Sequence, residues 1–282
     1  MVRALFWALG GCASLLSATE LRALEPPAVA ARLDGRAAVS EGDLSDWQAA
    51  QACYGEGTLT SRRAALMRLV EAAIAGKAML LAGRAGISDS DLSAEAERID
   101  RETRAPAILA CIEKALKPRE RYLRVFVRPA LVESRLRAFL IRDPGVQAGP
   151  RGRIEKALLR VRKGVMMENA AKEAGLVYSS STYSLAPGSP FEEDFIRRFL
   201  QGLKPGELRE EPIETDYDFR LVRLLGSKAG RWRFESVSAS KVSQEEWFKS
   251  LPKMKLEIMD EELRAWIKSI KGNPRLAAAE IR

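Results

Sequence analysis

Apolar residues recur at helical spacing through most of the first half of the chain. The longest such stretch covers residues 61–81, where Leu66, Leu69, Val70, Ala73 and Leu80 form one apolar stripe with arginines opposite. Serines at positions 40 and 88, each followed three residues later by an aspartate, predict the starts of two further helices. A hairpin around Asp34-Gly35 precedes them. We therefore predict a mainly helical module over residues 27–144.

The second half of the chain mixes helical spacing with alternation of apolar and polar residues. The expected elements are helices over residues 154–175 and 191–203, and extended segments over residues 210–215, 219–224 and 231–237. A capping box at Ser243 and the apolar positions within residues 260–270 predict the last helices. Residues 146–153 are polar and rich in Gly and Pro, which marks a boundary. The pattern predicts an α+β fold, with a small α/β domain over residues 152–226 and a C-terminal strand-helix extension over residues 227–282.

Charge and composition exclude several kinds of chemistry. The 282-residue chain has a net charge of +8 and contains no histidine, so Ser-His and Cys-His catalytic pairs are ruled out. The basic balance suits nucleic acid, an anionic membrane surface or acidic clients, but no nucleic-acid-binding motif is present. The acidic runs lie at expected helix starts or strand edges, where acidic residues need no metal to explain them. We therefore predict no metal site, no cofactor and no catalytic residue from the residues alone.

The N-terminus has the pattern of a secretory signal peptide over residues 1–23. A short positive start, Met1-Val2-Arg3, precedes an uncharged, apolar stretch that ends at Ala18. Leu9-Gly10-Gly11-Cys12 also resembles a bacterial lipobox, which would attach a lipid to Cys12. We expect export to the periplasm, with a membrane-anchored lipoprotein as the alternative. Export argues against DNA or RNA as a partner.

Two cysteines, Cys53 and Cys111, remain in the exported chain. An even number of cysteines in an oxidising compartment favours a disulfide between them. The alternative is a pair of buried free thiols.

Residues 191–225 combine a helix, the turn Leu203-x-x-Gly206-Glu207 and the segment Pro212-Ile213-x-Thr215 before a strand, and in this order they resemble the C-terminal half of parvulin-type peptidyl-prolyl isomerases. In that family a helix ends in a Leu-x-x-Gly-Glu turn, and a Pro/Val-x-Thr segment then leads into a final strand. The positions that match are Leu203, Gly206, Glu207, Pro212, Ile213, Thr215, Phe219, Leu221 and Val222. The histidine of the family falls on Arg220, and its turn glycine falls on Asp218. Residues 178–184, which contain no glycine, fall where the family has a glycine-rich loop.

The N-terminal part of the chain has a turn at Gly35, a helix cap at Ser40, a long helix and a Gly86-Ile87 turn before the cap at Ser88, and in this order it is similar to the chaperone module of periplasmic foldases of the SurA/PpiC type. Those modules begin with a turn, a short strand and a capped helix, and their long helix ends in a Gly-Ile turn before the next cap. The matching positions are Gly35, Val39, Ser40, Leu44, Gly86, Ile87, Ser88 and Leu92, whereas Asp34 replaces an asparagine. The resemblance implies that the C-terminal extension packs back onto the N-terminal module, which would also cover the apolar faces of Trp232 and Phe234 and of Trp266 and Ile270.

The parvulin resemblance implies a proline-binding cup beside polar groups that act on the amide. Phe191 or Phe195 is the candidate for the phenylalanine of the cup, and Tyr178 and Tyr183 are further candidates for client contact. The paired histidines of the family cannot exist here, because the chain has none. Arg220 is always charged and carries no acceptor, so it either points to solvent or pairs with Glu214 or Asp218.

Together these resemblances imply a periplasmic chaperone that binds unfolded or nascent exported proteins. Its parvulin-like domain is expected to have lost catalysis, and its basic residues are expected to favour acidic clients. One alternative is a divergent peptidyl-prolyl cis-trans isomerase. The other is a dedicated scaffold for envelope assembly.

Overall fold

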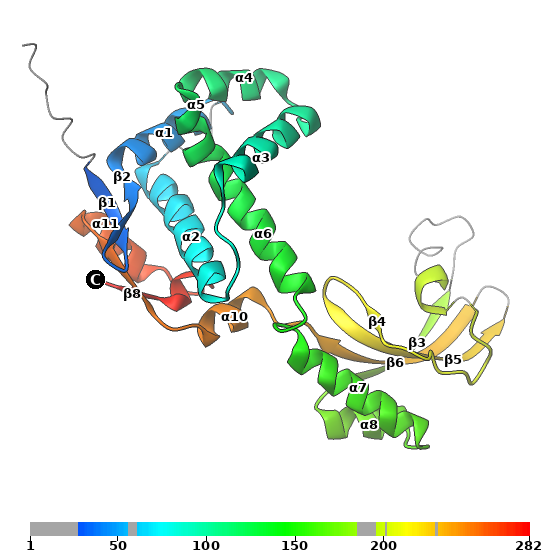
Figure 1. Ribbon diagram of the computed structural model, residues 1–282. Coiled ribbons are helices and arrows are strands. Elements are labelled where there is room, and N and C mark those ends of the chain that lie inside the picture. Colours follow the sequence, from blue (N-terminus) through cyan, green and yellow to red (C-terminus); the bar gives the residue numbers. More distant parts are fainter. Residues whose placement is uncertain (1–27, 56–60, 185–195, 201, 229–230) are drawn as a thin grey trace, which may run out of the picture.

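The computed structural model describes residues 28–55, 61–184, 196–200, 202–228 and 231–282. The predicted α+β composition is confirmed, because the described residues form helices and two four-stranded sheets. One sheet lies with helices α1–α6 and with the C-terminal segment, and the other carries α7 and α8 (Figure 1). The signal-peptide prediction for residues 1–23 and the lipid site at Cys12 lie outside the described residues.

The first sheet joins the two ends of the described chain. Its strands are β1 (Val29–Leu33), β2 (Arg36–Ser40), β7 (Met254–Ile258) and β8 (Ala279–Ile281), in the order β2-β1-β7-β8. The hairpin turn at Asp34-Gly35 has positive φ at both residues, as a two-residue hairpin turn requires. Ala31 of β1 lies opposite Ile258 of β7 in antiparallel pairing. The C-terminal segment therefore packs on the N-terminal module.

The helices of the first module follow the predicted caps. Its elements are α1 (Glu41–Ala52), α2 (Arg62–Leu81), α3 (Asp89–Glu102), α4 (Pro106–Ala115), α5 (Arg119–Tyr122), the π-helical turn η1 (Leu123–Val127) and α6 (Arg128–Arg142). Ser40 and Ser88 form complete capping boxes with Asp43 and Asp91. A central core gathers side chains from α2, α6, β1 and β7, including Ile74, and a second core lies under α3 and α4.

The predicted disulfide is present. Cys53, at the end of α1, is bonded to Cys111 in α4, and their Cα atoms lie 5.8 Å apart. The bond borders the second core, which contains Leu109, Ile112 and Tyr122.

The second sheet belongs to the smaller domain and is antiparallel throughout. Its strands are β3 (Val177–Ser184), β4 (Ile213–Glu214), β5 (Asp218–Lys228) and β6 (Arg231–Ser240), in the order β3-β6-β5-β4. Helices α7 (Ala148–Arg162) and α8 (Met167–Ala174) pack on one face through Phe219, Leu221 and Val237. The turn η2 (Ile196–Leu200) packs on the other face through Phe199 and Leu200.

Three predictions about this domain are wrong. The boundary at residues 146–153 is largely helical, because α7 begins at Ala148 and buries Pro150. The single helix over residues 154–175 is two helices, separated near Gly164, whose φ is +89°. The segment at residues 178–184, expected where the parvulin family has a loop, lies within strand β3.

The predicted domain limit at residue 226 is also misplaced. Strand β6, assigned from the sequence to the C-terminal extension, lies between β3 and β5 in the second sheet. The reason is burial. β5 carries apolar side chains on both faces, so it is favoured inside a sheet, between two neighbouring strands. β6 supplies one of these neighbours through antiparallel pairing. The extension that returns to the first module therefore starts after Ser240 and contains α10 (Gln244–Ser250), β7, α11 (Glu261–Ser269), the 3-10 turn η3 (Leu276–Ala278) and β8.

Candidate functional site

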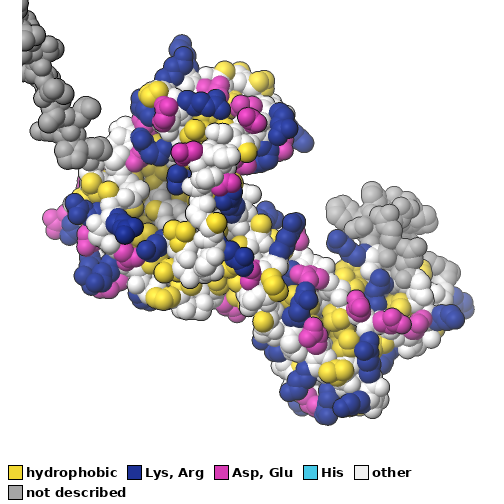
Figure 2. Space-filling model, viewed as in Figure 1, with side chains coloured by type: hydrophobic (Ala, Val, Ile, Leu, Met, Phe, Trp, Pro, Cys, Tyr) yellow, Lys and Arg dark blue, Asp and Glu magenta, His cyan; other side chains and the backbone are white. Residues whose placement is uncertain are grey.

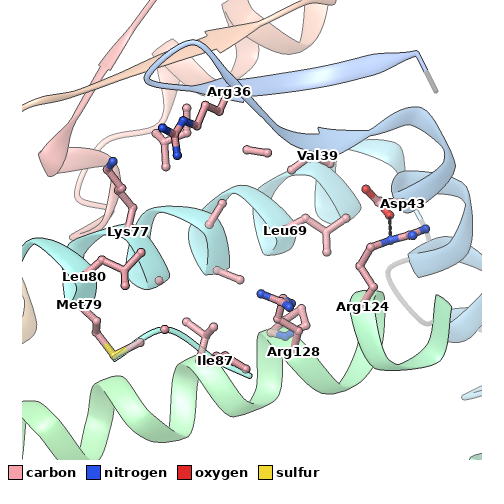
Figure 3. A pocket seen from close by; sticks show the side chains of 18 of the residues that line it. Arg36, Val39, Asp43, Leu69, Lys77, Met79, Leu80, Ile87, Arg124 and Arg128 are labelled. Carbon is pink, nitrogen blue, oxygen red and sulfur yellow. Dashed lines mark hydrogen bonds and ion pairs between the residues drawn. The ribbon is translucent and has the colours of Figure 1, made fainter. Parts of the chain in front are cut away.

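An apolar groove with a basic rim lies in the first module. It is bounded by strand β2, helix α2 and the η1–α6 region, and its cavity volume is about 460 Å³ (Figure 3). Its floor is apolar and is formed mainly by Val39, Leu69, Ala72, Ala73, Gly76, Ile87, Val125 and Val132. Such a volume accommodates a few side chains or a short peptide segment.

The groove exists because α2 is apolar around more than one face. Leu66, Val70 and Ile74 are buried in the central core. In the middle of the groove α2 presents the small residues Ala72, Ala73 and Gly76, between the bulkier Leu69 and Leu80 that also line it. Small side chains at these helical positions leave room that Leu or Ile would fill.

The end of α2 differs from the prediction. Leu80 was placed on the inward stripe, but it lines the groove and is 52 % exposed. Its neighbour Leu81 is 49 % exposed. The helix thus carries apolar surface to solvent at the mouth of the groove.

Four cationic side chains lie around this apolar floor. Arg36 comes from β2, Lys77 from α2, Arg124 from η1 and Arg128 from the start of α6 (Figure 3). Arg124 donates to Asp43 Oδ1 over 2.6 Å, and Lys77 lies 3.8 Å from Asp34.

Arg36 and Arg128 are the rim charges without compensation. Within the part of the chain that the structure describes, neither guanidinium lies within 4.0 Å of a carboxylate. Figure 3 shows Arg36 above helix α2 and Arg128 below it, on opposite sides of the groove. An anionic group bound over the floor therefore meets a positive charge from either side.

The predicted client residues of the second domain do not form one site. Tyr178 lies on the face of the sheet covered by α7 and α8, where its hydroxyl donates to Glu235 Oε2 over 3.0 Å. Burial, and then the hydrogen bond to Glu235, raise the pKa of this tyrosine. Arg220 lies on the opposite face, with its guanidinium carbon 5.5 Å from the centre of the Phe199 ring. The two candidates thus face away from each other.

Arg220 is held by the neighbouring carboxylate, one of the two partners expected for it. It pairs with Asp218, and Asp218 in turn accepts a hydrogen bond from Thr215 Oγ1 over 2.8 Å. Glu214, the other expected partner, pairs with Arg151 and Lys241 instead. Among the described residues, Arg220 Nε is buried without a hydrogen-bond partner.

The remaining candidates cannot be placed in a site. Phe191 and Phe195 lie outside the described residues. Tyr183 belongs to strand β3, but its side chain lies outside the described set. The described residues contain no group of three or more acidic or cysteine side chains placed to hold a metal ion. None of the described helices combines the length and the apolar character needed to cross a bilayer.

Sequence reasoning missed the groove. Its residues come from three segments, 33–43, 69–87 and 124–132, which together span most of the first module, and no local motif links them. The available signal was the unusually wide apolar arc of residues 61–81, which exceeds what a single buried face needs.

Comparisons of the chain with protein-family models, with curated proteins and with solved structures gave no match.

Proposed function

We propose that this protein is an exported chaperone that holds apolar segments of unfolded proteins in the groove of its first module. The observation that carries the proposal is the groove itself, with an apolar floor of small residues and a rim of cationic side chains. Its substrates are unfolded or nascent exported polypeptides. Folded proteins bury such segments, so a groove of this size selects the unfolded state.

Export is supported by two independent features. The first is the signal-like pattern at residues 1–23. The second is the disulfide between Cys53 and Cys111, because such bonds persist in oxidising compartments such as the periplasm. We therefore propose that the protein works in the periplasm, either free or held by a lipid at Cys12.

The second domain is proposed to resemble parvulins in form and to contribute binding without isomerisation. Arg220, which stands where the family has histidine, is engaged by Asp218 and cannot accept a proton. Proline isomerisation depends on groups placed to stabilise the twisted amide, and an arginine already paired in the ground state is a poor substitute.

The test pairs two assays on one preparation. Suppression of aggregation of an unfolded outer-membrane-type protein reports on holding, and isomerisation of a proline peptide reports on catalysis. Ala72→Trp fills the groove, whereas Ala94→Trp adds the same bulk at an exposed position of α3 and serves as the control. We expect suppression by the wild type and by Ala94→Trp, and its loss in Ala72→Trp.

Two outcomes contradict the proposal. Isomerisation well above background would favour the divergent isomerase. Absence of both activities would favour a dedicated scaffold with one folded partner.

A further inference from the structure

The outer edge of strand β3 differs from the other sheet edges of this protein. In the order β3-β6-β5-β4, β3 is a terminal strand, and no described strand pairs with its outer side. Its eight residues, VYSSSTYS, pair with β6 over the whole length in an uninterrupted register. The strand contains no charged residue and no proline. Val177 at its start is 66 % exposed.

The other three terminal strands of the two described sheets are protected against pairing. β2 contains Arg36, and its pairing with β1 is broken by two register shifts. β4 has two residues, one of them Glu214, and β8 has three, one of them Glu280. Short length, charge and irregular pairing are the usual devices that prevent a sheet edge from accepting another strand. Among the described terminal strands, β3 is therefore the one that lacks these protective features.

We propose that the outer edge of β3 binds an extended polypeptide segment by strand addition. The ligand is the backbone of an unfolded client, so this inference rests on the proposed function and extends it to the second domain. Backbone hydrogen bonds to an edge strand depend little on side-chain identity, which suits clients of varied sequence. A client strand of about five residues, an ordinary strand length, fits along this edge.

Charge favours a client over a second copy of the protein. Arg231 and Arg233 of β6 lie opposite Ser184 and Thr182 and are exposed. The chain as a whole has a net charge of +8, so two copies repel each other while an acidic client is attracted.

A single charge on β3 tests whether another strand can add at this edge. Ser180 is exposed and lies opposite Glu235 of β6, so Ser180→Lys meets an opposite charge within the folded domain. Lysine on an edge strand opposes the addition of another strand. Ser180→Thr, which adds no charge and has a good strand propensity, is the matched control.

The measurement uses the full chain carrying Ala72→Trp, so that the groove does not contribute. The probe is a capped peptide of ten residues that alternates valine and threonine around one glutamate. We expect it to slow hydrogen exchange of the amides in Val177–Ser184, and we expect Ser180→Lys to weaken its binding at least tenfold. Ser180→Thr should bind within twofold of the parent.

Unchanged exchange in β3, or equal binding by the lysine variant, overturns strand addition. If the wild type still suppresses client aggregation in that case, the proposed function stands without this edge. Conversely, β3 protection by the peptide without suppression of aggregation supports strand addition and contradicts the holding function. A wild-type dimer that Ser180→Lys converts to a monomer would assign the edge to a second copy and overturn the client assignment.

Discussion

Lys241 Nζ lies 2.7 Å from Glu214 Oε1 and donates a second hydrogen bond, also of 2.7 Å, to the carbonyl oxygen of Ile141. The lysine stands directly after β6, Glu214 belongs to β4, and Ile141 lies near the end of α6. Beside it, the buried Gln147 donates to the Leu140 carbonyl and accepts from the Val242 amide. The chain passes between the two modules twice, once after α6 and once after β6, and these contacts hold the two connecting segments together. Figure 2 shows the modules as two lobes.

Lys241→Met is therefore expected to destabilise the protein by about 1–2 kcal/mol. The lysine is only 8 % exposed, but Glu214 is more exposed and keeps Arg151 as a partner, which limits the cost. Denaturant unfolding measures the change in the free energy of unfolding. Lys249→Met, which removes an exposed pair with Glu245, is the control and should change stability by less than about 0.5 kcal/mol. Equal changes in the free energy of unfolding for the two substitutions would show that the Lys241 contacts stabilise the protein no more than an exposed ion pair does.

Removal of the disulfide should cost about 4 kcal/mol. The bond closes a loop with a sequence separation of 58 residues, and the chain-entropy model gives that magnitude. The comparison is between the oxidised wild type and the Cys53→Ala/Cys111→Ala variant in denaturant unfolding. Thiol labelling of the denatured, non-reduced protein should find neither cysteine free. Labelling of both cysteines in protein purified without reductant would contradict the assignment.

Stability should fall as the pH drops from about 4 towards 2, partly because of Asp91. The Ser88 backbone amide, then Arg135 and the Ser88 hydroxyl, lower the pKa of Asp91 to about 2. A carboxyl whose pKa is lower in the folded state stabilises the fold above its unfolded pKa and loses that contribution as the pH falls through the folded value. Asp91→Asn should flatten this part of the stability profile, measured by unfolding at several pH values. An unchanged slope would exclude the α3 cap as a source of the acid sensitivity.

The groove charges should govern affinity for acidic clients. Arg36→Gln combined with Arg128→Gln is expected to weaken binding of a reduced, carboxymethylated and permanently unfolded protein by about tenfold, since two exposed charges contribute roughly 1 kcal/mol or less each. The wild-type affinity should also fall more steeply with salt than that of the variant. Lys163→Gln, an exposed substitution outside the groove, is the control. Identical salt dependence in the wild type and the double variant would remove these arginines from client binding.

Local chemistry in the sequence was sufficient for the caps and the hairpin. Ser40, Ser88 and Ser243 form the capping boxes expected of them, because each bond joins residues three positions apart. Asp34 and Gly35 adopt the positive φ values of their turn for the same local reason. Parity favoured the pairing of Cys53 with Cys111, but these residues are 58 positions apart, and the fold decided that their Cα atoms lie 5.8 Å from each other.

Only the tertiary structure decided the partners that lie far apart in the chain. The pairing of β1 with β7 places Ala31 opposite Ile258. β6 belongs to the second sheet because its backbone pairs with the edge of β5. The groove likewise depends on how β2, α2 and α6 pack, and its arginines look like ordinary surface charges in the sequence. Such arrangements follow from shape and burial over the whole molecule, and a pattern read along a few residues carries no information about which distant surface will meet it.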